Sequence, residues 1–299
     1  MRCPETGEPL HLERGALANS SRTTTYPIDH SGIPQFAKAF LSEDAHQQQI
    51  HYDRIAEAYL ENLSYPHTQE YTAFLDRVFL AQVRSDSLGR TVELCCGHGE
   101  AFKLLKDRIG LGIGVDVSLS MLRSAAQMHA SSNLTFLQAD ATRLPLSDGT
   151  FDSVFMLGGI HHVNNRQALF SEVARILRPG GYFYFREPLD DFWLWRALRS
   201  VIYRVSPTLD HETERPLRRD ETLPFLERAG LTCTHWRSHG FLGFCFLMNS
   251  DVLVFNRLFR FIPGIRGITR FSTALDEFTT SLPGLRHAGL QVVGVAKKP

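Results

Sequence analysis

The stretch 92–116 constrains the fold more than any other part of this chain. It begins with an apolar run that carries one acid, Glu93, and continues into the glycine turn GHG at 97–99. A second apolar run then ends at another acid, Asp116. This order predicts a strand, a tight turn, a helix and a second strand with a carboxylate at its end. A βαβ unit of this kind is typical of nucleotide binding, because the bare turn lets backbone approach a ligand and the acid can accept from ribose hydroxyls.

The same alternation of strand and helix continues through the middle of the chain. Strands are predicted at 90–95, 111–116, 134–138, 151–157 and 182–187, and helices at 100–108, 118–129 and 165–177. This alternation indicates an α/β fold with a mostly parallel, doubly wound sheet. Apolar runs at 232–241 and 290–296 add two strands, which makes the sheet seven-stranded. An amphipathic pattern at 44–83 predicts a long helix before the first strand.

Composition narrows the class of protein. Lys and Arg number 32, as do Asp and Glu, so the formal net charge is zero and the basic surface of a nucleic-acid-binding protein is not expected. The five cysteines are odd in number and two of them are adjacent, at 95 and 96, which argues against a disulfide framework and favours the cytoplasm. Because no apolar run reaches about 18 residues, no transmembrane helix is predicted.

Four motifs resemble those of the class I S-adenosylmethionine-dependent methyltransferases, in particular the type 11 family. They are VELCCGHGE at 92–100, GVDVSLSML at 114–122, LQADATRLPLSDGTFD at 137–152 and LRPGGYFYFREP at 177–188. The resemblance implies a Rossmann-like methyltransferase fold and S-adenosylmethionine as the cofactor. One position departs from the family pattern: Cys95 stands where the first glycine of the turn is expected. Its side chain would narrow the approach to the ligand unless it faces the sheet.

The resemblance also implies roles around the cofactor. Asp116 would hold the ribose and Glu93 the methionine amino group, while Asp140 and the backbone of Ala141 would meet the adenine. The other candidates at this site are Cys95, Gly97, Gly99, Val117, Met121 and Leu157, with Leu119 as a further flank for the adenine. Structural alternatives stay open, because Glu93 can stabilise a turn, Asp116 can cap a helix and Asp140 can cap a loop. Leu119 and Met121 can equally be core residues.

Candidate catalytic residues follow the fourth and fifth strands. Ligands in such sheets lie at the carboxyl ends of the strands, where this chain carries His161, His162 and Glu187. Histidine ionises near neutral pH, so either imidazole can remove a proton from an acceptor during methyl transfer. A structural role is the alternative for the histidines, and for Glu187 the alternative is a hydrogen-bond acceptor. Transfer itself is an in-line displacement that mainly requires alignment and exclusion of water.

The first 40 residues form a separate polar segment, which leaves 41–299 for the methyltransferase domain. CPETGEPL at 3–10 and YPIDHSGIP at 26–34 resemble the zinc-ribbon-like module found ahead of bacterial methyltransferases. A tetrahedral zinc site needs four ligands. Thr6 stands in place of the second cysteine, and Cys3, His11 and His30 are too few and too unevenly spaced. We therefore expect a degenerate module without metal.

Two insertions, at about 188–222 and 243–288, are predicted to form helical lid segments over the site. The first contains Phe192, Trp193, Trp195, Leu198, Val201 and Ile202, interleaved with Arg196, Arg199 and Arg204. The second is again apolar with regular arginines. This composition favours a hydrophobic acceptor, and aromatic segments with basic side chains can also contact a membrane surface. The alternative is that the two segments simply pack on each other.

These observations favour a methyltransferase that acts on a small or lipid-like hydrophobic acceptor in secondary metabolism, with oxygen or carbon as the preferred atom. A cytoplasmic protein, in peripheral contact with the inner membrane through its lid, is expected. Two alternatives are a catalytically inert protein that binds S-adenosylmethionine and a nicotinamide-dependent reductase. The reductase fits less well, because Phe102 occupies the third small position that a dinucleotide-binding turn requires. The sequence leaves the oligomeric state open.

Overall fold

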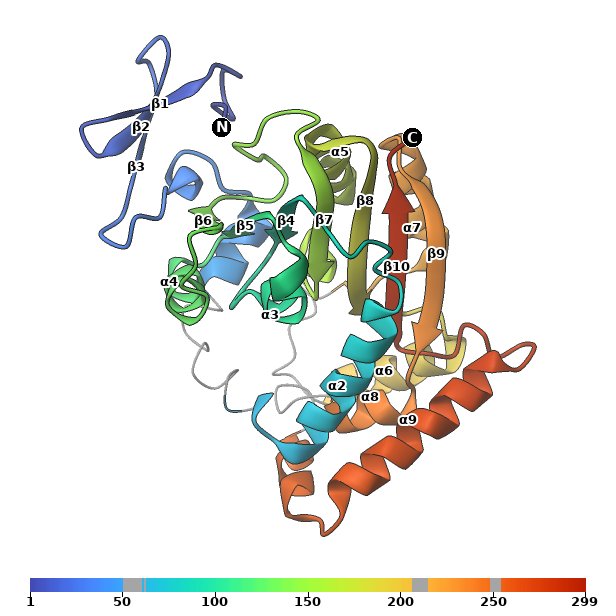
Figure 1. Ribbon diagram of the computed structural model, residues 1–299. Helices are drawn as coiled ribbons and strands as arrows, with labels where there is room; N and C mark the ends of the chain where they lie inside the picture. The colour runs from blue at the N-terminus through green and yellow to red at the C-terminus, as the bar shows by residue number, and fades with distance from the viewer. Residues whose placement is uncertain (51–60, 62, 206–214, 248–253) are drawn as a thin grey trace.

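A seven-stranded mixed sheet forms the centre of the molecule (Figure 1). This computed structural model describes residues 1–50, 61, 63–205, 215–247 and 254–299, without the side chains of 198, 201–205, 245–247 and 254–256. The strand order is β6-β5-β4-β7-β8-β10-β9. The strands are β4 (Arg90–Leu94), β5 (Leu111–Asp116), β6 (Leu134–Gln138), β7 (Phe151–Leu157), β8 (Leu177–Pro188), β9 (Thr232–His239) and β10 (Gln291–Lys297). Only β10 runs against its neighbours, so the predicted fold class is confirmed.

Both faces of the sheet are buried, as a doubly wound fold requires. One face lies under α2 (Pro66–Leu80), α3 (Glu100–Leu105) and α4 (Leu119–Met128). The other lies under α5 (Arg166–Ile176) and α7 (Arg219–Arg228). Neighbouring strand residues alternate between the two cores: Val154 and Val292 face α5 and α7, whereas Phe155 and Val293 face the opposite helices. The short helix η2 (Lys106–Arg108) follows α3, and η3 (Ile160–His162) follows β7.

Two predicted boundaries differ from the structure. The helix expected at 44–83 is interrupted before α2, because Tyr65 is extended (φ −67°, ψ 139°) ahead of Pro66. A proline disfavours helical backbone at the residue before it. The strand expected at 182–187 begins five residues earlier, at Leu177, with a register shift against β7 that accommodates Gly180 at φ 80°.

The N-terminal segment is a three-stranded antiparallel sheet of β1 (Leu10–Glu13), β2 (Ala16–Asn19) and β3 (Thr25–Pro27), followed by η1 (Phe36–Lys38). It has no core of its own. Cys3, Leu17 and Tyr26 belong to the same apolar cluster as the main sheet, and the Arg143 side chain donates to the Pro4 carbonyl at 3.0 Å. Among the described residues no group of three His, Cys, Asp or Glu could hold a metal ion. The zinc-ribbon resemblance and the domain boundary at 40 stay predictions.

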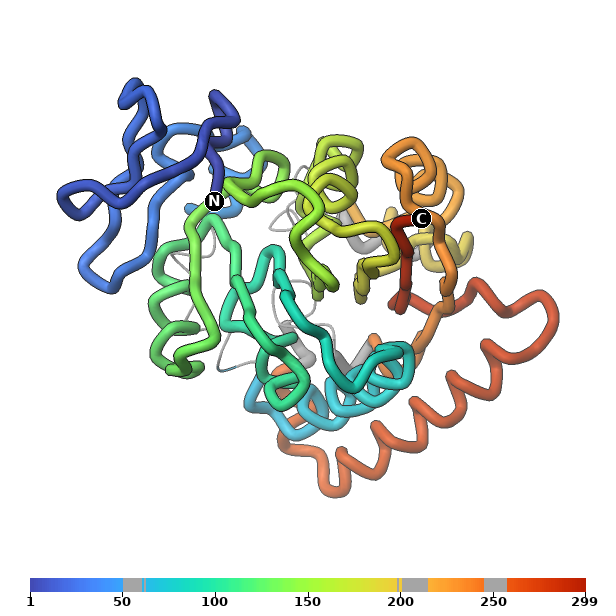
Figure 2. The backbone as a smooth tube through the Cα atoms, turned by 45° about the horizontal axis from the view of Figure 1, so that its top comes forward, coloured from blue at the N-terminus to red at the C-terminus, as the bar shows by residue number. Residues whose placement is uncertain are grey.

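A helical layer lies beyond the carboxyl ends of the parallel strands (Figure 1). It contains α2, α6 (Trp193–Val205), α8 (Leu242–Leu247), η4 (Val254–Phe261) and α9 (Ile265–Ser281). Figure 2 shows α9 on the opposite side of the molecule from the N-terminal sheet. All but α2 fall within the two predicted insertions, and no described helix is long and apolar enough to cross a membrane.

Aromatic contacts join the two insertions. The Trp195 ring lies edge-on to the rings of Phe241 and Phe244, with centroids 6.2 and 6.1 Å apart, and its exposed fraction is only 4%. Trp193, in contrast, is 67% exposed. The side chains predicted at 198, 201, 202 and 204 lie outside the described residues. At Trp195 the structure therefore agrees with the alternative that the two inserted segments pack on each other.

Candidate cofactor and catalytic site

The glycine turn 97–99 leaves β4 through left-handed backbone. Gly97 and Gly99 have φ values of 48° and 80°, which glycine adopts without steric cost. A side chain added at Gly97 would meet nothing within 4 Å, so this part of the turn faces open space. At Gly99 the His129 ring would lie 2.9 Å from an added Cβ. The turn therefore offers bare backbone at Gly97 and tight packing at Gly99.

Cys95 fits the turn because Gly159, which has no side chain, leaves room for the Cys95 side chain. Its φ of 49° is left-handed, a conformation that is uncommon for a residue with a side chain. A Cβ on Gly159 would lie 2.5 Å from the Cys95 Cβ and 3.0 Å from its Sγ. The thiol thus points toward the end of β7, away from the open side of Gly97. Burial raises the pKa of Cys95, so this thiol is neutral at physiological pH.

Asp116 connects the ends of β4 and β5. Its carboxylate accepts from the backbone N–H of Gly97 at 2.8 Å and from that of Ser118 at 2.9 Å. Ser118 in turn caps α4 by accepting from the Met121 N–H. The N-cap of α4 is thus Ser118 rather than Asp116, whose carboxylate fixes the glycine turn. Its ribose contact stays a prediction.

Glu93 is fully buried beneath the turn rather than exposed beside it. It is 1% exposed, and its two oxygens accept from the N–H groups of Ala101 and Phe102 at 2.8 and 3.3 Å. Burial raises the pKa of Glu93 to about 8, against the opposing effect of the Ala101 N–H. The structure gives Glu93 the turn-stabilising role left open as the alternative. Both of its oxygens are thus engaged by the start of α3, and its contact with a methionine amino group stays a prediction.

Both carboxylate oxygens of Asp140 accept hydrogen bonds. Oδ2 accepts from the N–H and hydroxyl of Ser42, at 2.9 and 2.6 Å, and Oδ1 accepts from the N–H and hydroxyl of Thr142, at 2.8 and 2.6 Å. Asp140 is 3% exposed. The loop-capping alternative is present, and Ser42 comes from the linker after the N-terminal sheet. An adenine amine at Asp140 therefore requires that Ser42 give way.

A cavity of about 740 Å³ lies at the carboxyl ends of β5 and β6, between these strands and the linker. Leu119 and Gln138 line it, and Gln138 pairs with Asp116 in the sheet. The Gln138 side chain also donates to the Val117 carbonyl at 2.9 Å. Linker residues close the cavity, among them Gln35, Leu41, His46 and Gln49. Leu119 is thus the better placed of the two adenine-flank candidates.

The remaining cofactor candidates take core positions. Met121 is 3% exposed and Ala141 is 6% exposed. Leu157, at the end of β7, is half-buried and packs on the apolar cluster beneath α2, α3 and α4. None of these three side chains lines the 740 Å³ cavity.

The three catalytic candidates come together after β7 and β8. Glu187 is fully buried, and its Oε1 accepts from the N–H groups of Gly159 and Ile160, both at 2.8 Å. Its Oε2 lies 2.8 Å from His161 Nδ1. An ionised carboxylate only accepts, so Nδ1 carries the proton and Nε2 of a neutral His161 is the basic nitrogen. The His162 ring lies 3.8 Å from the His161 ring, centroid to centroid.

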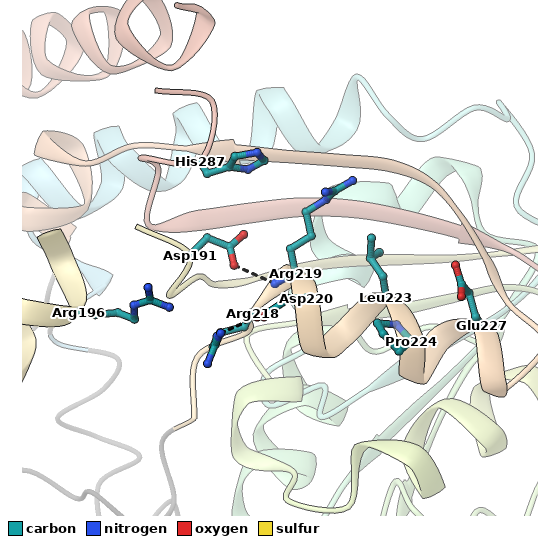
Figure 3. A pocket seen from close by; sticks show the side chains of 9 residues that line it. All are labelled: Asp191, Arg196, Arg218, Arg219, Asp220, Leu223, Pro224, Glu227 and His287. Carbon is teal, nitrogen blue, oxygen red and sulfur yellow. Dashed lines mark hydrogen bonds and ion pairs between the residues drawn. The ribbon is translucent and has the colours of Figure 1, made fainter. Parts of the chain in front are cut away.

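A second cavity, of about 560 Å³, lies between the start of α6, α7 and the segment before β10 (Figure 3). Three arginines and three acids line it, so their formal charges cancel, and His287 lies beside them. These residues are Arg196, Arg218, Arg219, Asp191, Asp220 and Glu227. The Arg219 N–H donates to Asp191 at 2.8 Å, and Arg218 pairs with Asp220. Only Leu223 and Pro224 are apolar. A balanced polar wall selects neither an anion nor a hydrophobic acceptor, and none of the predicted site residues lies in it.

Comparison with known proteins agrees with this arrangement. The family described as "Methyltransferase domain" matches residues 92–185, from the first strand of the site to the fifth. This segment of the chain is therefore similar to that family. The fatty-acid O-methyltransferase of Mycolicibacterium smegmatis is 34% identical over 117 residues, which are 38% of this chain and 43% of that relative. The malonyl-[acyl-carrier protein] O-methyltransferase of Marinomonas sp. is also 34% identical, over 127 residues, 40% of this chain and 47% of that protein.

The match to these curated relatives spans less than half of their length, so it bears on the matched segment alone. A solved structure of a SAM-dependent methyltransferase from Thermotoga maritima superposes with a TM-score of 0.54 at 19% identity. The superposition covers 83% of this chain and 98% of the Thermotoga maritima chain, and it supports the fold.

Three features of the site were not predicted from the sequence. They are the pairing of Ser42 with Asp140, the fit of Cys95 against Gly159, and the burial of His98. Both ring nitrogens of His98 are buried without a hydrogen-bond partner among the described residues. Burial, together with His129, lowers the pKa of His98, so the ring is neutral at physiological pH. Only its place inside the glycine turn marked His98 in the sequence.

Proposed function

We propose that this protein is an S-adenosylmethionine-dependent methyltransferase that modifies a small or lipid-like hydrophobic acceptor. The observation that carries the proposal is the glycine turn 97–99 held by Asp116 at the neighbouring ends of β4 and β5, inside the segment that matches the methyltransferase domain. Oxygen or carbon is the preferred atom to be methylated. Secondary metabolism is the preferred setting.

The residues around the turn suit this cofactor. Backbone is bare on the open side of Gly97 and again at Gly158, where an added Cβ would meet nothing within 4 Å. Asp116 is half-buried and pairs in the sheet with Gln138, which lines the 740 Å³ cavity together with the apolar side chain of Leu119. The unpartnered ring nitrogens of His98 are a further polar group that a ligand in the turn would satisfy. When bound, S-adenosylmethionine supplies a methyl group already activated by the sulfonium.

The Glu187–His161 pair supports a general base. Nε2 of His161 would take the proton from an acceptor hydroxyl or carbon acid as the new bond forms. Glu187 would hold Nδ1–H, fix the ring orientation and stabilise the imidazolium that results. Because this carboxylate is fully buried and also accepts two backbone N–H groups at 2.8 Å, the ring is held on rigid supports.

Two lines of support favour an apolar acceptor. The helical layer over the carboxyl ends of the strands contains an aromatic group in which the Trp195 ring contacts both Phe241 and Phe244. The two curated relatives named above act, by their names, on a fatty acid and on a malonyl group carried by a protein. An acyl compound is therefore the first acceptor class to try.

The test is calorimetric binding of S-adenosylmethionine and of S-adenosylhomocysteine. Saturable binding of both is expected, and Asp116→Ala should weaken it at least about tenfold, the loss of one charge-assisted hydrogen bond to ribose. Asp86→Ala removes an exposed acid elsewhere and serves as the matched control. Because Asp116 also holds the turn, Asp116→Asn and thermal unfolding of each variant separate lost contact from lost structure.

The alternatives make opposite predictions. Absence of binding to either compound would remove the methyltransferase proposal. Binding without transfer of labelled methyl to any acyl acceptor or host extract would favour the inert binding protein. Hydride transfer from labelled NADPH would favour the reductase, which Phe102 opposes, because its ring is 1% exposed and packs against Phe136 where a small residue is needed.

A further inference from the structure

One face of α9 is apolar and uncovered. Ile268, Phe271, Leu275, Phe278 and Leu282 follow one another at intervals of three and four residues, the spacing of a single helix face. Phe271 is 70% exposed and Phe278 is 63% exposed. Leu258, Phe261 and Ile262 in and after η4 are also exposed and continue the surface. We call these eight side chains the α9 surface.

The opposite face of α9 is the one that packs on the protein. Its buried residues are Ile265, Thr269, Ser272, Thr273, Asp276 and Thr280. Asp276 accepts from the N–H groups of Leu242 and Gly243 at the start of α8, at 3.0 and 2.7 Å. This helix therefore turns its polar residues inward and its large apolar residues outward, the reverse of a helix whose apolar face serves the core.

Four exposed arginines in η4 and α9 lie near the residues of the α9 surface in the sequence, and we call them the arginine border. Arg257, Arg260, Arg266 and Arg270 are all exposed, against two acids, Glu61 and Glu70, that pair with three of them. Four positive and two negative charges leave an excess of two positive charges at this border. The nearest acids on α9 do not offset it, because Asp276 is buried and Glu277 turns to Arg237 and His239. No exposed residue between 257 and 282 in the described chain is acidic.

We propose that the α9 surface docks on a membrane that contains anionic lipid. An apolar helix face with basic side chains along its edges lies flat in the interface of such a membrane, its rings among the acyl chains and its arginines at the headgroups. A second copy of the chain fits this surface less well. A two-fold dimer would bring the arginine border of one copy onto that of the other. Anionic lipid complements the border instead.

The α9 surface lies on the side of the molecule where the proposed chemistry would occur, but the docking proposal does not depend on that chemistry. α9 contacts α2 and α8, and this layer lies beyond the carboxyl ends of the strands (Figure 1). A bilayer on α9 would thus lie on the same side of the molecule as the glycine turn and His161. An acceptor dissolved in lipid would then reach the crevice without crossing water.

The experiment is co-sedimentation of the full chain with vesicles of phosphatidylcholine, with and without phosphatidylglycerol. Binding is expected only to the anionic vesicles and is expected to weaken as salt is added. Phe271→Ser with Phe278→Ser should lower the partition coefficient at least about tenfold. Leu12→Ser, which removes a leucine that is 69% exposed on β1, is the matched control and should change nothing.

A charge variant tests the border independently of the rings. Each arginine near an anionic surface contributes about fivefold to partition, so Arg257→Gln with Arg266→Gln should lower partition to anionic vesicles about 25-fold. Both positions are exposed, so folding should be unaffected, which a thermal unfolding curve checks.

Three results would overturn the proposal. They are equal binding to neutral vesicles, no binding to either kind, and a concentration-dependent dimer that the Phe271 and Phe278 changes abolish. Cofactor binding, measured by calorimetry on the same variants without vesicles, should equal that of the unaltered chain. A loss of vesicle binding with unchanged cofactor binding would therefore concern docking alone and not the proposed function.

Discussion

The Glu187 carboxylate lies 2.8 Å from His161 Nδ1, fully buried, while the imidazole side chain is 12% exposed. This relationship makes Nδ1 a fixed donor, so Nε2 is the ring nitrogen that can accept a proton. Replacement by Glu187→Gln should reverse the arrangement. The new amide can still accept from Gly159 and Ile160 through its oxygen, but its NH₂ donates to Nδ1 and moves the ring proton to Nε2.

Methyl transfer to a hydroxyl or carbon acceptor by Glu187→Gln should therefore fall about 10²-fold or more, with kcat affected rather than the affinity for S-adenosylmethionine. Steady-state kinetics combined with calorimetry provide the check. The matched control is Glu172→Gln on α5, an acid that pairs with Arg175 away from the site. An unchanged kcat would show that no base acts at His161 on that acceptor.

Glu93 should make the stability of the protein fall as pH rises. Burial raises its pKa from 4.5 to about 8, so the folded state binds a proton that the unfolded state releases. The stabilisation is complete below about pH 4.5 and is lost as pH rises toward 8, in total on the order of 5 kcal/mol. Urea unfolding of the protein and of Glu93→Gln across this range should give a larger decline for the unaltered chain. Parallel curves for the two would contradict the assignment.

Gly159 should tolerate no side chain while Cys95 is present. An alanine there places its Cβ 2.5 Å from the Cys95 Cβ, closer than packed atoms approach. Gly159→Ala should cost about 1–3 kcal/mol of unfolding free energy. Cys95→Gly in the same chain should recover most of it, since glycine also adopts the φ of 49° at position 95 freely. A double-mutant cycle by urea unfolding measures the coupling, and additive losses would refute the contact.

Ser42 should compete with adenine for Asp140. Its hydroxyl lies 2.6 Å from Oδ2, the oxygen that an adenine amine would need. Ser42→Ala removes that bond, worth about 1 kcal/mol, and should tighten S-adenosylmethionine about fivefold in calorimetry. Ser64→Ala, an exposed serine in the same N-terminal third, is the comparison. Weaker binding by Ser42→Ala would mean that Ser42 supports the cavity instead.

Much of the central α/β region was predictable because its signals are local. The strands from β4 to β8 were predicted from the period and the length of their apolar runs. The glycine turn and Asp116 were predicted from their spacing alone. Contacts between distant residues were not predictable in this way. Ser42 and Asp140 are 98 positions apart, and His161 and Glu187 are 26 apart. Only the parallel pairing of β7 with β8 brings the latter pair together.

The sequence by itself determined the α/β class, the seven strands and the acid at the end of β5, because hydrophobic period and glycine placement act within a few residues of chain. Tertiary structure alone decided that Glu93 is buried under α3 and that Asp140 is engaged by the linker. It also decided that α9 turns its aromatic face outward. Each of these depends on which surfaces remain uncovered after packing, and that depends on how distant segments are placed in space.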